Sequence, residues 1–167
     1  GNDYRHLVAG PLEPGIQIGY CCSTGGGWSG GLVAHRSQIH PVADDVSDEA
    51  AVMIEPTAVG VHAALKARVQ PGATVVVLGS GTMGLVTIAA LRHLTEAATI
   101  IASAKYPEQS ALARKLGADI VVEPKELARA VRRATGSYVI GGDLSAGADV
   151  VIDAVGSEAS VDEAIGI

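Results

Sequence analysis

Between residues 70 and 156 the chain alternates short, continuously apolar runs with longer segments that mix polar and apolar positions. The apolar runs are rich in valine and isoleucine and occupy residues 74–78, 99–102, 120–122 and 149–155. Strands of a parallel sheet have this composition, because helices bury both of its faces. The intervening segments predict helices over residues 85–94, 107–117 and 125–134. The pattern therefore predicts an α/β fold with a doubly wound parallel sheet.

The first 46 residues differ, since their apolar pieces are short and are interrupted by glycine and proline. Such punctuation predicts irregular β structure. Residues 47–70 predict two linking helices, the first capped by Ser47 and the second following Pro56. We therefore predict three regions, which are residues 1–46, 47–70 and 71–167.

The sharpest motif is a G-x-G-x-x-G sequence between the apolar run at 74–78 and the helix predicted at 85–94. Its residues are Gly79, Ser80, Gly81, Thr82, Met83 and Gly84. In this setting the first glycine allows a tight turn, the second lets the backbone approach a pyrophosphate, and the third brings helix and strand together. The phosphates then face N–H groups at the helix N-terminus. The alternative is a tight turn without a ligand, but three glycines lower stability with no benefit to a simple turn.

The residues after the second apolar run bear on which dinucleotide is bound. NAD-binding domains place an acidic residue there, about 20 positions beyond the motif, to bind the ribose 2′-OH. Here Ser103, Lys105 and Tyr106 follow the run, and the first carboxylate is Glu108. A hydroxyl for hydrogen bonds, a cation for charge and a ring to stack on adenine suit a 2′-phosphate. This favours NADP(H) over NAD(H), with a merely solvated Lys105 as the alternative.

Composition narrows the class of protein. The chain of 167 residues has 48% hydrophobic residues and a mean hydropathy of +0.32, which excludes global disorder. Its net charge of −6 offers no basic surface to nucleic acid or to an anionic membrane. No apolar run reaches the ~20 residues of a spanning helix. Cys21 and Cys22 are adjacent and cannot cross-link distant segments of the chain by a disulfide, so we expect a reduced, cytoplasmic setting.

Several short motifs, taken in order, resemble the medium-chain, zinc-dependent alcohol dehydrogenase superfamily, especially its polyol, threonine and glucose dehydrogenase branches. They are Gly25-Gly26-Gly27-Trp28-Ser29, Asp48-Glu49-Ala50-Ala51, Glu55-Pro56, Pro71-Gly72, the glycine motif and Leu116-Gly117-Ala118-Asp119. The resemblance implies an incomplete Rossmann-type cofactor domain, preceded by part of a GroES-like β domain. It also implies hydride transfer between a nicotinamide cofactor and an alcohol or carbonyl, with zinc polarising the substrate oxygen.

The resemblance assigns a few further residues. Glu55 matches a carboxylate that binds the catalytic zinc or its water in intact enzymes; a helix-end carboxylate before a proline is the alternative. Met83 matches a residue behind the nicotinamide ring, although a core methionine is equally compatible. Val155 and Gly156 match the loop beside the nicotinamide ribose. The family's other zinc ligands precede the matched region, so we expect an inactive internal fragment without zinc that self-associates through its incomplete sheet.

Two other functions stay open. One is a non-catalytic dinucleotide-binding module or remnant, which the missing zinc ligands favour. The other is a zinc-free quinone or enoyl reductase of the same superfamily, because these enzymes share the cofactor loops. Asp153, at the end of an apolar run, is open to two interpretations, as a functional carboxylate or as a hydrogen-bond acceptor for the neighbouring loop. The expected small-molecule partner is an alcohol or carbonyl compound, and the sequence indicates no particular substrate.

Overall fold

The computed structural model of the chain describes residues 27, 30–32, 36, 39–141 and 143–167. The chain divides into two compact units, Gly1–Ser47 and Asp48–Ile167. The described residues of the first unit contain no strand, and most of the β pieces predicted there lie outside the described residues. The GroES-like assignment of residues 1–46 therefore stays a prediction.

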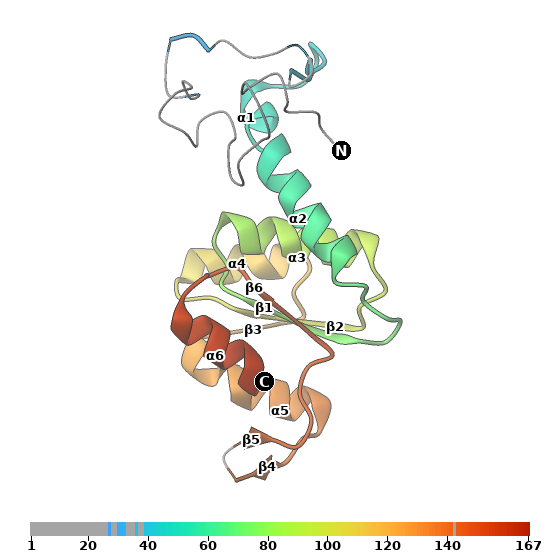
Figure 1. Cartoon of the computed structure of the whole chain (residues 1–167), viewed down its shortest axis with the longest axis vertical. Coiled ribbons are helices and arrows are strands. Elements are labelled where there is room, and N and C mark those ends of the chain that lie inside the picture. The colour runs from blue at the N-terminus through green and yellow to red at the C-terminus, as the bar shows by residue number, and fades with distance from the viewer. Residues whose placement is uncertain (1–26, 28–29, 33–35, 37–38, 142) are drawn as a thin grey trace, which may run out of the picture. The chain divides into compact units, whose positions relative to one another are not determined.

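The second unit alternates helices and strands (Figure 1). Its elements are α1 (Asp48–Ala51), α2 (Ile54–Lys66), β1 (Thr74–Leu78), α3 (Thr82–Leu94), β2 (Thr99–Ser103), α4 (Pro107–Lys115), β3 (Ile120–Val122), a 3₁₀ turn (Pro124–Glu126), α5 (Leu127–Thr135), β4 (Val139–Ile140), β5 (Asp143–Leu144), β6 (Val150–Asp153) and α6 (Glu158–Gly166). Within the part of the chain that the structure describes, every helix is too short or too polar to cross a bilayer.

Four strands form one parallel sheet in the order β3-β2-β1-β6. In the central strand β1, Val75 pairs with Ile100 of β2 on one side and with Val150 of β6 on the other. The chain moves outward from β1 to β2 and β3, then returns to the opposite side of β1 through β6. The predicted doubly wound parallel sheet is therefore confirmed, and the apolar runs at 74–78 and 120–122 form strands with the predicted bounds.

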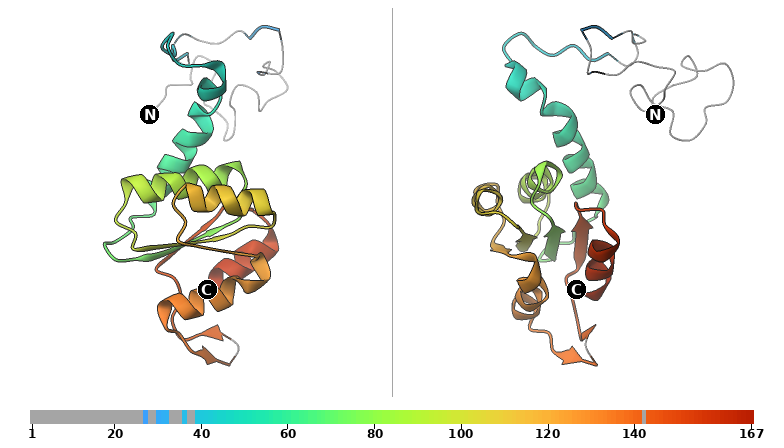
Figure 2. Two further views of the ribbon diagram at one scale, coloured as in Figure 1. Left: turned by 180° about the vertical axis from the view of Figure 1, so that it is seen from behind. Right: turned by 90° about the vertical axis from the view of Figure 1, so that its left-hand side faces the viewer.

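Helices cover both faces of this sheet, with α3 and α4 on one face and α5 and α6 on the other (Figures 1 and 2). Successive side chains of a strand point to opposite faces. Accordingly, Val75 and Val77 join a core with α2, α3 and α4, whereas Val76 and Leu78 join a core with α5 and α6. All four side chains are at most 1% exposed. The central strand is thus the shared wall of two hydrophobic cores, which explains its continuous apolar sequence.

Helix α2 packs against α3 through a buried glycine. A Cβ atom on Gly60 would lie 2.8 Å from Val86 Cγ2 and 2.9 Å from the Val86 carbonyl carbon. Because no real Cβ fits at such distances, the absence of a side chain at Gly60 sets how closely the two helices approach.

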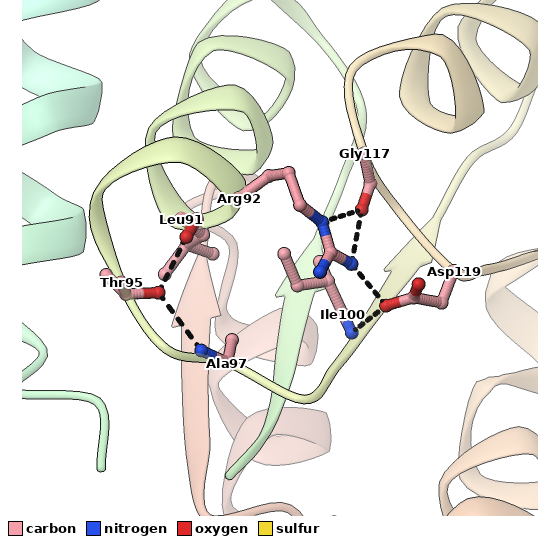
Figure 3. A network of polar contacts seen from close by, with 7 residues as sticks. All are labelled: Leu91, Arg92, Thr95, Ala97, Ile100, Gly117 and Asp119. Carbon is pink, nitrogen blue, oxygen red and sulfur yellow. Dashed lines mark hydrogen bonds and ion pairs between the residues drawn. The ribbon is translucent and has the colours of Figure 1, made fainter. Parts of the chain in front are cut away.

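A clasp of polar contacts, formed by Arg92, Gly117 and Asp119, joins the end of α3 to the turn between α4 and β3 (Figure 3). Arg92 Nε and Nη2 donate to the Gly117 carbonyl oxygen at 3.0 and 2.8 Å. Arg92 Nη2 also donates to Asp119 Oδ2 at 2.5 Å. The same carboxylate oxygen accepts a bond of 2.7 Å from the Ile100 N–H of β2. One arginine therefore ties together a helix, a turn and a sheet strand.

Several predicted bounds are wrong in instructive ways. Helix α3 begins at Thr82 and not at residue 85, so half of the glycine motif lies inside its first turn. Pro56 does not precede α2 but lies in its first turn. Proline is tolerated there because the N–H groups of the first turn have no hydrogen-bond partner within the helix. The run at 149–155 ends as a strand at Asp153. The β4–β5 hairpin and α6 were not predicted.

Candidate cofactor-binding site

A pocket of about 430 Å³ lies at the carboxyl end of the parallel sheet. Its walls come from the loops after β1, β2, β3 and β6 and from the first turns of α6. In doubly wound sheets the strand order reverses between the first strand and the strand added on its other side, and ligands bind in the crevice there. Of the predicted site residues, those lining this pocket are Gly79, Ser80, Gly81, Ser103, Lys105, Tyr106 and Val155.

The glycine motif forms the floor of the pocket as a tight turn leading into α3. Gly79 has a φ of +84°, a conformation that glycine adopts without strain. Gly81 is the N-cap of α3 and has no side chain that could occupy the N–H groups of the first turn. A Cβ on Gly84 would lie 1.9 Å from the Gly79 carbonyl oxygen. Gly79 thus makes the predicted turn and Gly84 the predicted close packing, while the approach of a pyrophosphate to Gly81 stays a prediction.

Two serine side chains fasten the glycine turn to β2. The Gly79 N–H donates to Ser103 Oγ, and Ser80 Oγ donates to the Ser103 carbonyl oxygen, both at 2.9 Å. Ser80 and Ser103 are only 2% and 3% exposed. The sequence suggested Ser103 as a phosphate ligand; in the structure its hydroxyl oxygen already accepts a bond from the turn. Ser103 therefore shapes the pocket floor.

Lys105 and Tyr106 lie on the exposed rim between β2 and α4. Lys105 Nζ stands 5.7 Å from the centroid of the Tyr106 ring, within the range of a cation–π contact. The Lys105 N–H donates to Gln109 Oε1 at 3.3 Å, and Gln109 also lines the pocket. No acidic residue lies in this β2–α4 connection. The rim therefore presents a positive charge and an aromatic face.

The loop after β6 forms the opposite wall and is organised by Asp153. Asp153 Oδ1 accepts bonds from the N–H groups of Val155 and Gly156 at 2.8 and 3.2 Å. Asp153 Oδ2 accepts a bond from Ser160 Oγ at 2.8 Å. Burial raises the pKa of Asp153, but the bonds from Val155, Ser160 and Gly156 outweigh this effect and lower the pKa below its usual value. Hydrogen bonds to the neighbouring loop thus account for this carboxylate at the end of a strand.

Helix α6 adds pocket residues that the sequence analysis missed, among them Ser157, Ser160 and Glu163. Ser157 caps α6 and forms a capping box with Ser160, a pattern of N-cap serine that the sequence does contain. Glu163 is half-buried in the pocket wall, and burial raises its pKa above the usual range. A partly desolvated carboxylate therefore faces the same cavity as Lys105.

Four predicted site residues do not line this pocket. Thr82, Met83 and Gly84 lie within the first turn of α3, and Gly156 follows Val155 in the loop after β6 with a φ of +75°.

The remaining predicted residue, Glu55, is exposed in the first turn of α2. Across the described residues, no group of three or more His, Cys, Asp or Glu side chains is arranged to hold a metal ion. These residues therefore do not fit a zinc centre, and the zinc role of Glu55 stays a prediction.

Comparisons with known proteins agree with this geometry. Residues 82–167 match the family model described as zinc-binding dehydrogenase. The chain is 31% identical to the L-idonate 5-dehydrogenase of Vitis vinifera, over 87% of this chain and 46% of that protein. It is 45% identical to the probable D-xylulose reductase A of Arthroderma otae, over 72% of this chain and 33% of that protein. The zinc-dependent alcohol dehydrogenase 2 of Streptococcus pneumonia superposes with a TM-score of 0.63 and 30% identity, covering 77% of this chain and 35% of that structure. The chain thus spans less than half the length of these relatives.

Proposed function

This chain belongs to the zinc-binding dehydrogenase family, and on that premise we propose that it forms the cofactor site of an oxidoreductase that uses NADP(H). The observation that carries the proposal is the pocket between β1 and β6, with the glycine turn as its floor. When bound, the reduced nicotinamide would donate a hydride to a carbonyl carbon, and the oxidised nicotinamide would accept one from an alcohol carbon. The chain's own residues bind the cofactor, orient it and line its pocket.

Each part of the pocket suits one part of the dinucleotide. Gly81, where the backbone is open, would receive the pyrophosphate, because the first-turn N–H groups of α3 favour negative charge. Lys105 and Tyr106, which line the pocket after β2, would take the adenosine half. Val155, whose side chain is 57% exposed after β6, would lie on the nicotinamide side. This orientation follows because the glycine turn lies at the end of β1, whereas the positively charged rim lies at the end of β2.

The proposed preference for NADP(H) rests on the rim charge. A 2′-phosphate adds negative charge to the adenosine ribose, and Lys105 is the pocket's basic side chain. Tyr106, 53% exposed, offers its ring to adenine. A cytoplasmic location, which the cysteine usage suggested, stays a prediction, as does self-association.

The substrate class is proposed from the relatives. Their names refer to L-idonate and D-xylulose, which are polyhydroxylated compounds with a secondary alcohol or ketone. We infer that the enzyme containing this pocket oxidises or reduces such a group. Among the described residues no cluster of His, Cys, Asp or Glu side chains offers zinc a set of ligands, so the proposal concerns the cofactor pocket alone.

A fluorescence titration of the purified chain with NADPH and NADH tests the proposal. We expect NADPH to bind about 10-fold more tightly, which corresponds to about 1.4 kcal/mol. The Lys105→Ala variant should lose this preference while keeping its affinity for NADH. Lys115→Ala, which removes a lysine from the far end of α4, serves as the matched control. A preference for NADH would refute the 2′-phosphate assignment, and no binding of either dinucleotide would refute the cofactor site.

The carboxylate of Glu163 makes cofactor affinity depend on pH. Its raised pKa means that it ionises late, and the ionised form repels the phosphates that enter the same pocket. We therefore expect the ratio of the wild-type Kd for NADPH to the Glu163→Gln Kd to rise roughly threefold as the pH increases through that pKa. The ratio removes the effect of the 2′-phosphate, which titrates at about pH 6 in both measurements. Glu158→Gln, on the exposed side of α6, should keep the wild-type pH profile; equal profiles for all three proteins would contradict the prediction.

A further inference from the structure

The wall of the pocket after β6 is held in place by a side chain that does not itself line the pocket. Asp153 ends β6, and the loop that follows it contributes Ala154, Val155 and Ser157 to the pocket lining. Two sets of contacts fix that loop against the glycine turn. The inference that follows rests on the proposed function, because it concerns the same dinucleotide.

The first link is from the carboxylate to the loop backbone. Asp153 Oδ1 accepts both the Val155 N–H at 2.8 Å and the Gly156 N–H at 3.2 Å. Two bonds to one oxygen from successive N–H groups fix the direction in which the chain leaves β6. The turn is completed by Gly156, whose positive φ of +75° suits glycine.

The second link is from the loop to the glycine turn. Val155 Cγ2 lies 2.7 Å from the position that a Cβ on Gly79 would occupy, so the valine packs directly over the missing side chain. The Ala154 N–H also donates to the Leu78 carbonyl oxygen at 3.0 Å. On the other side, Ser103 Oγ accepts the Gly79 N–H. The phosphate-binding turn is therefore held between β2 and the β6 loop.

We propose that Asp153 is a positioning residue for the dinucleotide: through the N–H groups of Val155 and Gly156 it sets the loop that closes the pocket over Gly79. Without these bonds the loop loses its fixed exit from β6, and Val155 no longer has one position against the turn. The nicotinamide half of the cofactor then meets a variable wall. The effect on binding acts through the loop, since the carboxylate itself is not part of the lining.

A second role of Asp153 has to be separated from this one. Its other oxygen accepts from Ser160 Oγ at 2.8 Å, and Ser160 belongs to the capping box at the start of α6. This bond stabilises the helix whatever is bound in the pocket. Ser160→Ala removes it and leaves both backbone bonds to Oδ1 intact, so its melting temperature measures this helix contribution alone. Because Ser160 lines the pocket, the affinity control is Asp149→Ala: Asp149 lies just before β6 and outside this pocket, and its Oδ2 accepts the Thr74 N–H at 2.7 Å.

The test measures the Kd for NADPH and the melting temperature of five proteins, the wild type, Asp153→Ala, Asp153→Asn, Ser160→Ala and Asp149→Ala. Asparagine keeps a carbonyl oxygen that accepts from Val155 and Gly156, whereas alanine removes it. We expect Asp153→Ala to weaken NADPH binding at least about 10-fold, equivalent to about 1.4 kcal/mol, and Asp153→Asn to restore it to within about threefold. Ser160→Ala should lower the melting temperature by the contribution of the helix bond, and Asp149→Ala should lower it but keep the wild-type affinity.

Wild-type affinity in Asp153→Ala would overturn the proposal, as would an equal loss of affinity in Asp149→Ala, which would assign the effect to a general loss of stability around β6. If Asp153→Ala does not fold, Asp153→Ser takes its place with the same expectation, because serine keeps a polar atom but cannot reach both N–H groups. Failure of the wild type to bind either NADPH or NADH would instead refute the proposed function itself, and with it the positioning role.

Discussion

Replacing Gly84 by alanine is expected to destabilise the domain by about 3 kcal/mol, the upper part of the usual range for overpacking. The new methyl group would lie 1.9 Å from the Gly79 carbonyl oxygen and 2.9 Å from its carbonyl carbon. Neither atom can withdraw, because the Gly79 N–H is bound to Ser103. Alanine gains about 1 kcal/mol over glycine inside a helix, which is too little to offset the clash. Urea denaturation followed by circular dichroism measures the loss.

Gly81→Ala is the matched control within the same motif. A Cβ on Gly81 meets no atom within 4 Å, and its φ of −76° suits alanine. We expect the free energy of unfolding to stay within about 0.5 kcal/mol of the wild type. NADPH binding should nevertheless weaken, since the methyl group occupies the place where the pyrophosphate approaches the backbone. If Gly84→Ala were as stable as Gly81→Ala, the turn would have room that the structure does not show.

The second large effect is expected at Arg92, whose replacement by alanine should cost about 2 kcal/mol. The guanidinium supplies two bonds to the Gly117 carbonyl oxygen and one to Asp119. Its side chain is 31% exposed, so solvent screens the ion pair in part. The larger loss comes from the Gly117 carbonyl, which loses both of its donors. Arg92→Lys should recover only part of the stability, because a lysine cannot present the two donors of the guanidinium in a fixed fork.

Arg129→Ala shows what an ordinary surface arginine contributes. Arg129 pairs with Glu126 at 3.6 Å, and both side chains are about half exposed (56% and 46%). Exposed pairs of this kind contribute about 0.5 kcal/mol or less. Thermal and urea unfolding of the two alanine variants should therefore separate clearly. Equal losses would mean that the clasp at the end of α3 is no stronger than a solvated ion pair.

The sequence was sufficient for the fold wherever burial dictates composition. Strands β1 and β3 have the predicted bounds because all of their positions are β-branched or apolar and none is a turn residue. The helix boundaries were less predictable. Thr82 and Met83 look like turn residues beside three glycines, yet they are helical, because the turn closes as early as Gly81. Helix α6 was not predicted, although Ser157 provides an N-cap signal at its start.

The candidate site was predictable to the extent that it is local in sequence. Gly79, Gly81 and Lys105 follow their strands directly, so the carboxyl ends of a parallel sheet bring them together. Glu163 could not be placed in the same way, because it reaches the pocket from a helix about 60 residues beyond Lys105. The bond from Gly79 to Ser103 is equally non-local, joining residues 24 positions apart. Contacts of this kind depend on strand order and register, which a single sequence does not state.

The strand order also has a consequence for the time course of folding. Strand β1 pairs with β2 over a separation of 25 residues, as Thr74 with Thr99, but with β6 over 75, as Val75 with Val150. Closing the longer loop costs more chain entropy, and non-local parallel pairing is intrinsically slow. The β1–β2–β3 half is therefore expected to assemble before β6 docks. Six of the fifteen residues that line the pocket follow β6, so the complete binding site forms only in the final step. The dinucleotide can therefore stabilise that step and cannot act as a template for the earlier ones.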